Sequence, residues 1–78
     1  MKITVSAHGV LKKYFNFEDG ESLSANVPDG SAVADILHNY NIPDGMVMFA
    51  TVNGAKKDTL TKLCDGDLLV LIPPLSGG

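Results

Sequence analysis

The chain has 78 residues, of which 45% are hydrophobic and 19% charged, and six basic residues against nine acidic ones give a formal net charge of -3. A chain of this length forms one domain and leaves no room for a substrate domain beside a cofactor domain, which excludes two-domain enzymes. A domain this small hides little more than ~60% of its unfolded surface, and a deep enclosed active site would consume most of its core. These proportions favour a binding or carrier protein over an enzyme that acts alone.

The single cysteine, Cys64, excludes an intramolecular disulfide framework and any zinc or iron–sulfur site that needs several cysteines. We therefore expect a reducing, cytoplasmic setting. The first residues read as the start of a strand rather than as a secretory signal. The longest apolar run, Leu68–Leu75, is far shorter than the ~20 residues that cross a bilayer, so no membrane partner is expected.

The basic residues are all lysines and are scattered along the chain, so the sequence offers no basic stripe for a phosphate backbone. Nucleic acid is therefore not an expected partner. The small excess of acidic residues points instead to partners with basic grooves.

The first part of the chain predicts a hairpin. Polar and apolar residues alternate over Lys2–His8, which indicates a half-buried strand. Its buried face carries Ile3, Val5 and Ala7. Val10–Phe15 is too short for a regular helix and predicts a turn or a single helical turn. Asn16–Glu21 favours a turn, and strict alternation resumes over Ser22–Val27, which predicts an antiparallel partner strand after a long loop.

One amphipathic helix follows the break at Pro28–Gly30. Ser31 is the expected N-cap, because its hydroxyl can accept an amide hydrogen of the first helical turn. The apolar residues that recur at helical spacing are Val33, Ile36, Leu37 and Tyr40. Asn39, Asn41 and Pro43 end the helix.

A third strand is expected over Met46–Val52, which is apolar on both faces, and Asn53–Gly54 forms a tight turn after it. Ala55–Cys64 reads as a mixed connection between strands. Leu60 and Leu63 can anchor this connection to the core.

The last expected strand, Leu68–Ile72, follows a turn at Asp65–Asp67 and is apolar throughout, which suits a strand covered on both faces. The first and last strands can pair in parallel at the centre, because the chain between them supplies the crossover. The order predicts an α+β fold, a β-grasp (ubiquitin-like) roll with a mixed sheet of four to five strands and one main helix on one face. Residues 1–78 form this single domain, and a flexible diglycine tail starts at about residue 74.

The chain ends in two prolines, which stop the sheet, and a diglycine, which leaves the last backbone atoms without side chains. Fully extended, Pro74–Gly78 reaches at most roughly 17 Å, enough to enter a narrow channel in a partner. Gly77 allows the close backbone approach that such a channel requires. An isolated Gly-Gly is more often only a frayed terminus, so the sequence around the tail decides its meaning.

Three sequence motifs occur together in this chain: Val52–Gly54, Leu63–Asp67 and Ile72–Gly78. Together they resemble the small sulfur-carrier family known as MoaD/ThiS, and the resemblance covers the whole chain in length and element order. The prolines directly before the hydrophobic-small-Gly-Gly end look more like the molybdopterin-synthase small subunit than like the thiamine sulfur carrier.

The resemblance implies a sulfur carrier and not an enzyme. On this resemblance, a ubiquitin-activating-like enzyme of the MoeB/ThiF type adenylates the Gly78 carboxylate, and a sulfur donor such as a cysteine desulfurase or rhodanese converts it to a thiocarboxylate. Gly77 threads the partner's channel. The carrier binds no cofactor itself, since ATP is used by the adenylating enzyme.

The resemblance also implies the sulfur acceptor. In the molybdopterin branch the tail enters a large subunit of the MoaE type, where sulfur is placed on a pterin precursor to make the dithiolene that binds molybdenum or tungsten. In the thiamine branch the partner is a thiazole synthase.

The open face of the sheet is the expected docking surface. Alternation directs Leu69 and Leu71 inward beneath the helix. The outward apolar residues are Phe49, Leu68, Val70 and Ile72, and the tail residues expected to contact the partner are Pro73, Pro74, Leu75 and Ser76. Exposed apolar clusters commonly mark partner sites. The alternative is that the loop over Val10–Phe17 covers the outward residues within the monomer.

The remaining polar residues are expected to be structural. His8 and His38 meet no acid or cysteine at ligand spacing, so no metal site is assigned. Cys64 reads as a small apolar residue, and Asp65 and Asp67 read as turn formers.

Two other functions stay open on the sequence. One is a ubiquitin-like protein modifier that is activated in the same way and then joined through the diglycine to lysines of a target. The other is a plain β-grasp interaction module with an inert tail.

Overall fold

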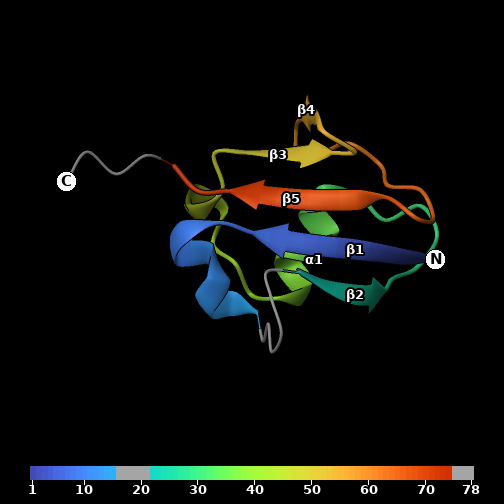
Figure 1. Cartoon of the computed structure of the whole chain (residues 1–78), viewed down its shortest axis with the longest axis horizontal. Helices are drawn as coiled ribbons and strands as arrows, with labels where there is room; N and C mark the ends of the chain where they lie inside the picture. Colours follow the sequence, from blue (N-terminus) through green and yellow to red (C-terminus); the bar gives the residue numbers. More distant parts are fainter. Residues whose placement is uncertain (16–21, 75–78) are drawn as a thin grey trace.

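The computed structural model describes residues 1–15 and 22–74, in which the strands form one mixed sheet with a helix against it (Figure 1). The strands are β1 (Lys2–Ala7), β2 (Ser22–Asn26), β3 (Phe49–Val52), β4 (Ala55–Lys57) and β5 (Leu68–Ile72). The helical segments are the α-helix α1 (Val33–Asn39) and the 3-10 helices η1 (Gly9–Tyr14) and η2 (Asp44–Met46). The predicted turn at Asn16–Glu21 lies outside the described residues.

The sheet has the order β2-β1-β5-β3-β4, with β1 and β5 parallel at the centre and the other neighbouring strands antiparallel. The parallel pair is possible because the chain between β1 and β5 crosses over, carrying α1 to one face of the sheet (Figure 1). The predicted β-grasp roll is therefore confirmed, and so is the β1–β2 hairpin. Among the described residues, no helix is long and apolar enough to span a membrane.

The core lies between the sheet and α1. The inward side chains of β1 and β5 are at most 2% exposed: Ile3, Val5, Ala7, Leu69 and Leu71. The helix contributes Val33, Ile36 and Leu37 to the same cluster, with Tyr40 packed at its margin. These residues are the ones that the alternation and the helical spacing predict. Val10–Phe15, predicted as a turn or one helical turn, is largely η1, whose Leu11 is fully buried.

The third strand is shorter than predicted. Asp44–Met46 forms η2 and only Phe49–Val52 forms β3, so the expected strand over Met46–Val52 is wrong at its start. The amide of Met46 donates to the carbonyl of Pro43 at 3.0 Å, which closes a tight turn. This local hydrogen bond takes the place of strand pairing, and an apolar run alone carries no signal of it.

The predicted connection over Ala55–Cys64 contains a strand. Asn53 and Gly54 both have positive φ, 53° and 87°, as a two-residue hairpin turn requires, and they return the chain antiparallel to β3 as β4. Asn53 also holds the start of β5: its Oδ1 accepts from the amide of Leu68 at 3.0 Å, and its Nδ2 donates to Asp67 at 2.9 Å.

Only one of the two predicted leucine anchors in that connection is buried. Leu63 is 3% exposed and belongs to the core, whereas Leu60 is 78% exposed, so its predicted role as an anchor is wrong. The carboxylate of Asp58 accepts from the amide of Leu60 at 2.9 Å. This local turn directs Leu60 to solvent, as turns formed by an aspartate side chain commonly do.

Ser31 is not the N-cap of α1, contrary to the prediction. Its hydroxyl donates to the carbonyl of Pro28 at 2.7 Å, and the N-cap position is Ala32, whose amide donates to the carboxylate of Asp35 at 2.8 Å. The next two amides of the helix donate to carbonyls of the 58–62 loop, at Thr61 and Thr59. A hydroxyl cap is unnecessary because this distant loop satisfies the first helical turn.

Asp35→Ala is expected to destabilise the domain by about 1 kcal/mol, because the amide of Ala32 loses its acceptor and the helix N-terminus loses a negative charge. Chemical unfolding followed by circular dichroism measures the change. Asp35→Asn keeps an acceptor oxygen and should lose clearly less. Equal stability of the wild type and Asp35→Ala would contradict this account of the helix start.

Candidate functional site: the tail root and the open sheet face

The central strand β5 is held on both sides up to its last residue. The carbonyl of Leu71 accepts from the amide of His8 at 3.1 Å, and the carbonyl of Ile72 accepts from the amide of Met48 at 2.8 Å. Pro73 and Pro74 follow directly, and proline has no amide hydrogen with which to extend the ladder. We call Ile72, Pro73 and Pro74 the tail root. It is a rigid point of departure for the end of the chain.

Gly9 lies against the tail root and is required there for two reasons. Its φ is +57°, which L side chains rarely adopt, and a Cβ at this position would lie 3.3 Å from Cγ of Pro73. A glycine directly after a predicted strand reads only as a strand end. The contact with Pro73 joins opposite ends of the chain, so sequence analysis does not reveal it.

Gly9→Ala is expected to cost about 1–2 kcal/mol through the positive φ and to displace the proline that begins the tail root. Gly66→Ala is a matched control, since Gly66 also has a positive φ, +85°, but a Cβ there meets nothing within 4 Å. Both variants should unfold at lower denaturant concentration. If the terminus is adenylated, as the family resemblance implies, only Gly9→Ala should also slow that step, and an equal effect of both variants on adenylation would contradict the role assigned to the Gly9–Pro73 contact.

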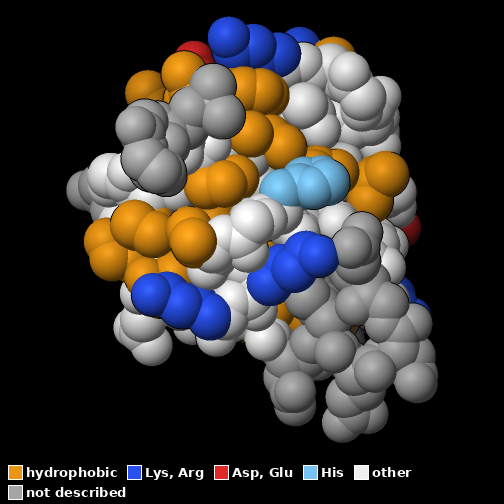
Figure 2. Space-filling model, turned by 60° about the vertical axis from the view of Figure 1, so that its left-hand side comes forward, with side chains coloured by type: hydrophobic (Ala, Val, Ile, Leu, Met, Phe, Trp, Pro, Cys, Tyr) orange, Lys and Arg blue, Asp and Glu red, His pale blue; other side chains and the backbone are white. Residues whose placement is uncertain are grey.

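An apolar groove surrounds the tail root. Its lining residues are His8, Gly9, Val10, Met46, Ile72, Pro73 and Pro74. Val10 is 56% exposed at its margin. Figure 2 shows the end of the molecule from which the chain leaves the sheet, with hydrophobic side chains gathered across it and lysines around them.

The sheet face opposite α1 carries the outward residues in the predicted places. Phe49 is paired with Ile72, and Thr51 with Val70, so these side chains share one face. Leu68 is 40% exposed, and Phe49, Val70 and Ile72 are half-buried. The inward direction of Leu69 and Leu71 is confirmed, since both are 0% exposed.

The alternative, in which the Val10–Phe17 loop covers this face, holds only in part for the section of the loop that the structure describes. η1 borders Ile72 through the groove of the tail root. Leu68 at the other end of β5 stays exposed. Of the outward residues Leu68, Val70 and Ile72 on β5, Leu68 is therefore more accessible to solvent than Ile72.

The last four predicted tail residues, Leu75, Ser76, Gly77 and Gly78, lie outside the described residues. The structure brings Pro73 and Pro74 together with Ile72 at the end of β5, and Phe49 lies beside Ile72 on β3. The partner-binding role of all these residues stays a prediction.

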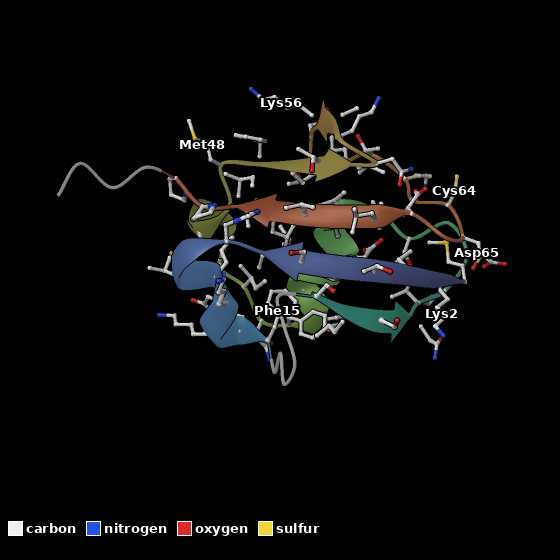
Figure 3. All side chains as sticks on the ribbon, in the orientation of Figure 1. Lys2, Phe15, Met48, Lys56, Cys64 and Asp65 are labelled. Atoms are coloured by element: carbon white, nitrogen blue, oxygen red, sulfur yellow. The ribbon has the colours of Figure 1, made fainter. Side chains whose placement is uncertain are left out.

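Of the residues predicted to be structural, Cys64, Asp65 and Asp67 lie away from the tail root, whereas His8 lines its groove. Figure 3 places Cys64 and Asp65 at the opposite end of the sheet, with Lys2. Asp67 accepts from the amide of Cys64 at 2.7 Å, which confirms it as a turn former. Asp65 lies in the same turn, as predicted, but its carboxylate accepts from the amide of Lys2 in β1 at 2.7 Å. Cys64 is exposed.

His8 and His38 are also exposed. The described residues contain no group of three or more histidine, cysteine, aspartate or glutamate side chains that could hold a metal ion.

No family model and no curated protein matches the sequence. Solved structures do match the fold. SAMP1, a small archaeal modifier protein from Haloferax volcanii, is 17% identical with a TM-score of 0.69 and full coverage of both chains. The putative molybdopterin converting factor subunit 1 from Pyrococcus furiosus is 17% identical with a TM-score of 0.71, over 95% of this chain and 98% of that one.

A third match is the complex of subunits 1 and 2 of the molybdopterin-converting factor from Helicobacter pylori, at 21% identity, a TM-score of 0.63 and full coverage of both chains. These similarities establish the class of fold. The chain has the MoaD/ThiS-like form of the ubiquitin-like β-grasp, as the resemblance of its last residues implies.

Proposed function

We propose that this chain is a sulfur carrier whose Gly78 carboxylate is adenylated and then converted to a thiocarboxylate, and that it serves molybdopterin biosynthesis as the small, non-catalytic subunit of molybdopterin synthase. The observation that carries the proposal is the tail root. A strand held on both sides up to Ile72 ends in two prolines, and the sequence continues as Leu75-Ser76-Gly77-Gly78. Because the sheet hydrogen bonds end at the tail root, the residues after it can enter a partner while the sheet stays intact.

The Gly78 carboxylate is a poor electrophile, so it must be activated before sulfur can be added. The Gly78 carboxylate attacks the α-phosphorus of ATP on the adenylating enzyme, pyrophosphate leaves, and an acyl-adenylate forms. The terminal sulfur of a persulfide on a cysteine desulfurase or rhodanese then attacks the acyl carbon, AMP leaves and an acyl disulfide forms. A thiol attacks the sulfur of this disulfide that belongs to the donor enzyme, which releases the Gly78 thiocarboxylate and leaves the thiol as a disulfide on that enzyme. Glycine side chains contribute no acid, base or oxyanion donor, so the partners provide these groups, and the carrier provides position and reach.

The molybdopterin branch is favoured over the thiamine branch by the prolines of the tail root and by two of the structural neighbours. One neighbour is a putative molybdopterin converting factor subunit 1, and another is that subunit in complex with subunit 2. We therefore propose a MoaE-type large subunit as the acceptor of the tail. A thiazole synthase is the acceptor in the alternative branch.

A second candidate function, protein modification through the diglycine, is favoured by a different neighbour, SAMP1 of Haloferax volcanii. Activation is the same in both functions, and they differ in the final acceptor: a pterin precursor or a lysine amine. The proposal includes a cytoplasmic location, which the lone, exposed Cys64 supports because it fits a reducing compartment.

Reconstitution of the synthase tests the proposal. The thiocarboxylated chain is mixed with a MoaE-type subunit and the pterin precursor, and dithiolene formation is measured as the oxidised fluorescent pterin. We expect product in proportion to the thiocarboxylate consumed, and none from the untreated carboxylate form. Consumption of the thiocarboxylate by a thiazole synthase alone would move the assignment to the thiamine branch, and protein conjugates in place of either product would support the modifier.

A further inference from the structure

An apolar and cationic surface lies beside the tail root on β3 and β4. Met48 is 61% exposed, and the Nζ atom of Lys56 lies 4.8 Å from the ring centroid of Phe49. Lys57 is also exposed and extends the charge to the other face of this edge, because it pairs with the buried Ala50 whereas Lys56 pairs with Thr51 of the open face. We call Met48, Phe49, Lys56 and Lys57 the β4 margin, and Figure 3 shows Met48 and Lys56 along this side of the sheet. It is continuous with the tail root, because Phe49 pairs with Ile72 and the amide of Met48 donates to the carbonyl of Ile72.

The positive charge of the β4 margin is not paired within the described residues. The structure gives neither Lys56 nor Lys57 an ion pair with a described carboxylate. Asp58 is next in the chain, but its Oδ1 accepts from the amide of Leu60 at 2.9 Å and from the hydroxyl of Thr61 at 3.3 Å. Its carboxylate is held in its own turn but keeps its negative charge, so this side of the sheet carries two lysines against one carboxylate.

Most of the other described carboxylates are engaged elsewhere. Asp29 pairs with the terminal ammonium of Met1 at 3.1 Å, and Asp35 accepts from the start of α1. Asp65 accepts from the amide of Lys2 in β1, and Asp67 accepts from the amide of Cys64. Figure 3 places Lys2, Cys64 and Asp65 at the end of the sheet opposite the tail root. The net charge of -3 predicts partners with basic grooves, whereas the surface beside the tail root is locally cationic.

The backbone of β4 is a free edge of the sheet. Among the residues that the structure describes, β4 is the last strand in the order and pairs only with β3, and all three of its residues are exposed. A free edge can receive one more extended segment, and lysines at an edge oppose pairing with another copy of the same edge. A second copy of this chain would bring lysines against lysines. An extended segment with carboxylates would meet complementary charge.

We propose that the β4 margin is the docking site for an extended segment of the adenylating enzyme that carries acidic and apolar side chains. The carboxylates pair with Lys56 and Lys57, and the apolar side chains lie against Met48 and Phe49. This inference rests on the proposed function and adds to it the chemistry of the partner's surface. The adenylating enzyme is the partner named because it must hold the tail root whichever acceptor follows.

Charge reversal tests the docking site. The dissociation constant for the host's adenylating enzyme is measured for the wild type, for Lys56→Glu with Lys57→Glu, and for Lys62→Glu as a matched control. Lys62 is exposed beside the start of α1, where its backbone forms an isolated β-bridge with Ala32 and its Nζ donates to the carbonyl of Gly30 at 3.3 Å. The double variant should bind about tenfold more weakly, the control should bind as the wild type does, and the difference should shrink as salt is raised. Unfolding curves of the variants should differ little, because the changed side chains are exposed and the contacts they lose, that of Lys56 with the Phe49 ring and that of Lys62 with the carbonyl of Gly30, are weak.

The outcomes separate this inference from the proposed function. If the wild type is thiocarboxylated and the double variant binds the enzyme as tightly as the wild type, the docking site is overturned and the carrier function stands. If the enzyme does not activate the wild type, both fail. Sedimentation tests the alternative occupant. If the wild type is a dimer and the double variant is a monomer, the β4 margin binds a second copy of the chain and the docking site is overturned. Neutral replacements, Lys56→Gln with Lys57→Gln, should give an intermediate dissociation constant and serve if the reversed variant does not fold.

Discussion

Leu69→Ala is expected to lower the free energy of unfolding by about 2–5 kcal/mol, enough to leave much of the protein unfolded at moderate temperature. Leu69 is 0% exposed in the central strand, paired with Val5 of β1 on one side and Val52 of β3 on the other. At ordinary values per residue, a domain of this length has a total stability of roughly 4–12 kcal/mol. The cavity that Leu69→Ala leaves beneath α1 therefore removes a large part of the free energy of unfolding.

Urea unfolding followed by circular dichroism measures this loss, and the next residue in the same strand provides the control. Leu68 is 40% exposed on the other face, so Leu68→Ala should cost about 1 kcal/mol or less. Equal losses for the two leucines would mean that the sheet does not have one covered face and one open face.

Gly77→Val is expected to slow adenylation of the terminus about hundredfold while leaving the unfolding midpoint unchanged. The physical reason is the channel: a branched side chain beside the reacting carboxylate widens a segment that must lie close to the partner's walls and restricts its backbone angles. The tail begins beyond the last hydrogen bond of β5, so stability should not change.

Adenylation is measured as pyrophosphate release by the activating enzyme in the presence of ATP. Ser24→Val is a control for the added side chain, because Ser24 is exposed on the edge strand β2, away from the tail root. The control should be activated at the wild-type rate. Activation of Gly77→Val at that same rate would show that the tail does not thread a narrow channel.

The fold is largely predictable from the sequence because its strongest signals are local. Alternation marks the buried face of β1, the unbroken apolar run marks β5 as a central strand, and the spacing of Val33, Ile36 and Leu37 marks the covered side of α1. β4 is missed because Ala55–Lys57 is short and polar. Its existence depends on pairing with β3 after the turn at Asn53–Gly54, and single-residue patterns do not carry that long-range information.

The start of α1 is missed for a related reason. Ser31 has the side chain that caps helices, but carbonyls of Thr59 and Thr61 reach the first amides from a distant loop. The competition between a local cap and a tertiary partner is decided only in the folded chain.

The candidate site is predictable in part. The prolines, the outward row on β5 and the neighbouring Phe49 follow from the sequence and occupy their expected places. The Gly9–Pro73 contact and the cationic β4 margin do not follow, because each depends on segments that only the sheet brings together. Net charge, in particular, carries no information on where the lysines gather.

The central claim is that the Gly78 carboxylate is the reactive group. Intact-protein mass spectrometry tests it most directly, after incubation of the chain with ATP, the host's adenylating enzyme and a sulfur donor, with a chain lacking Gly78 treated in parallel. We predict a mass gain equal to the replacement of one oxygen by sulfur in the full chain and no gain in the shortened one. An unchanged mass in the full chain, or the same gain in both, would contradict the sulfur-carrier account.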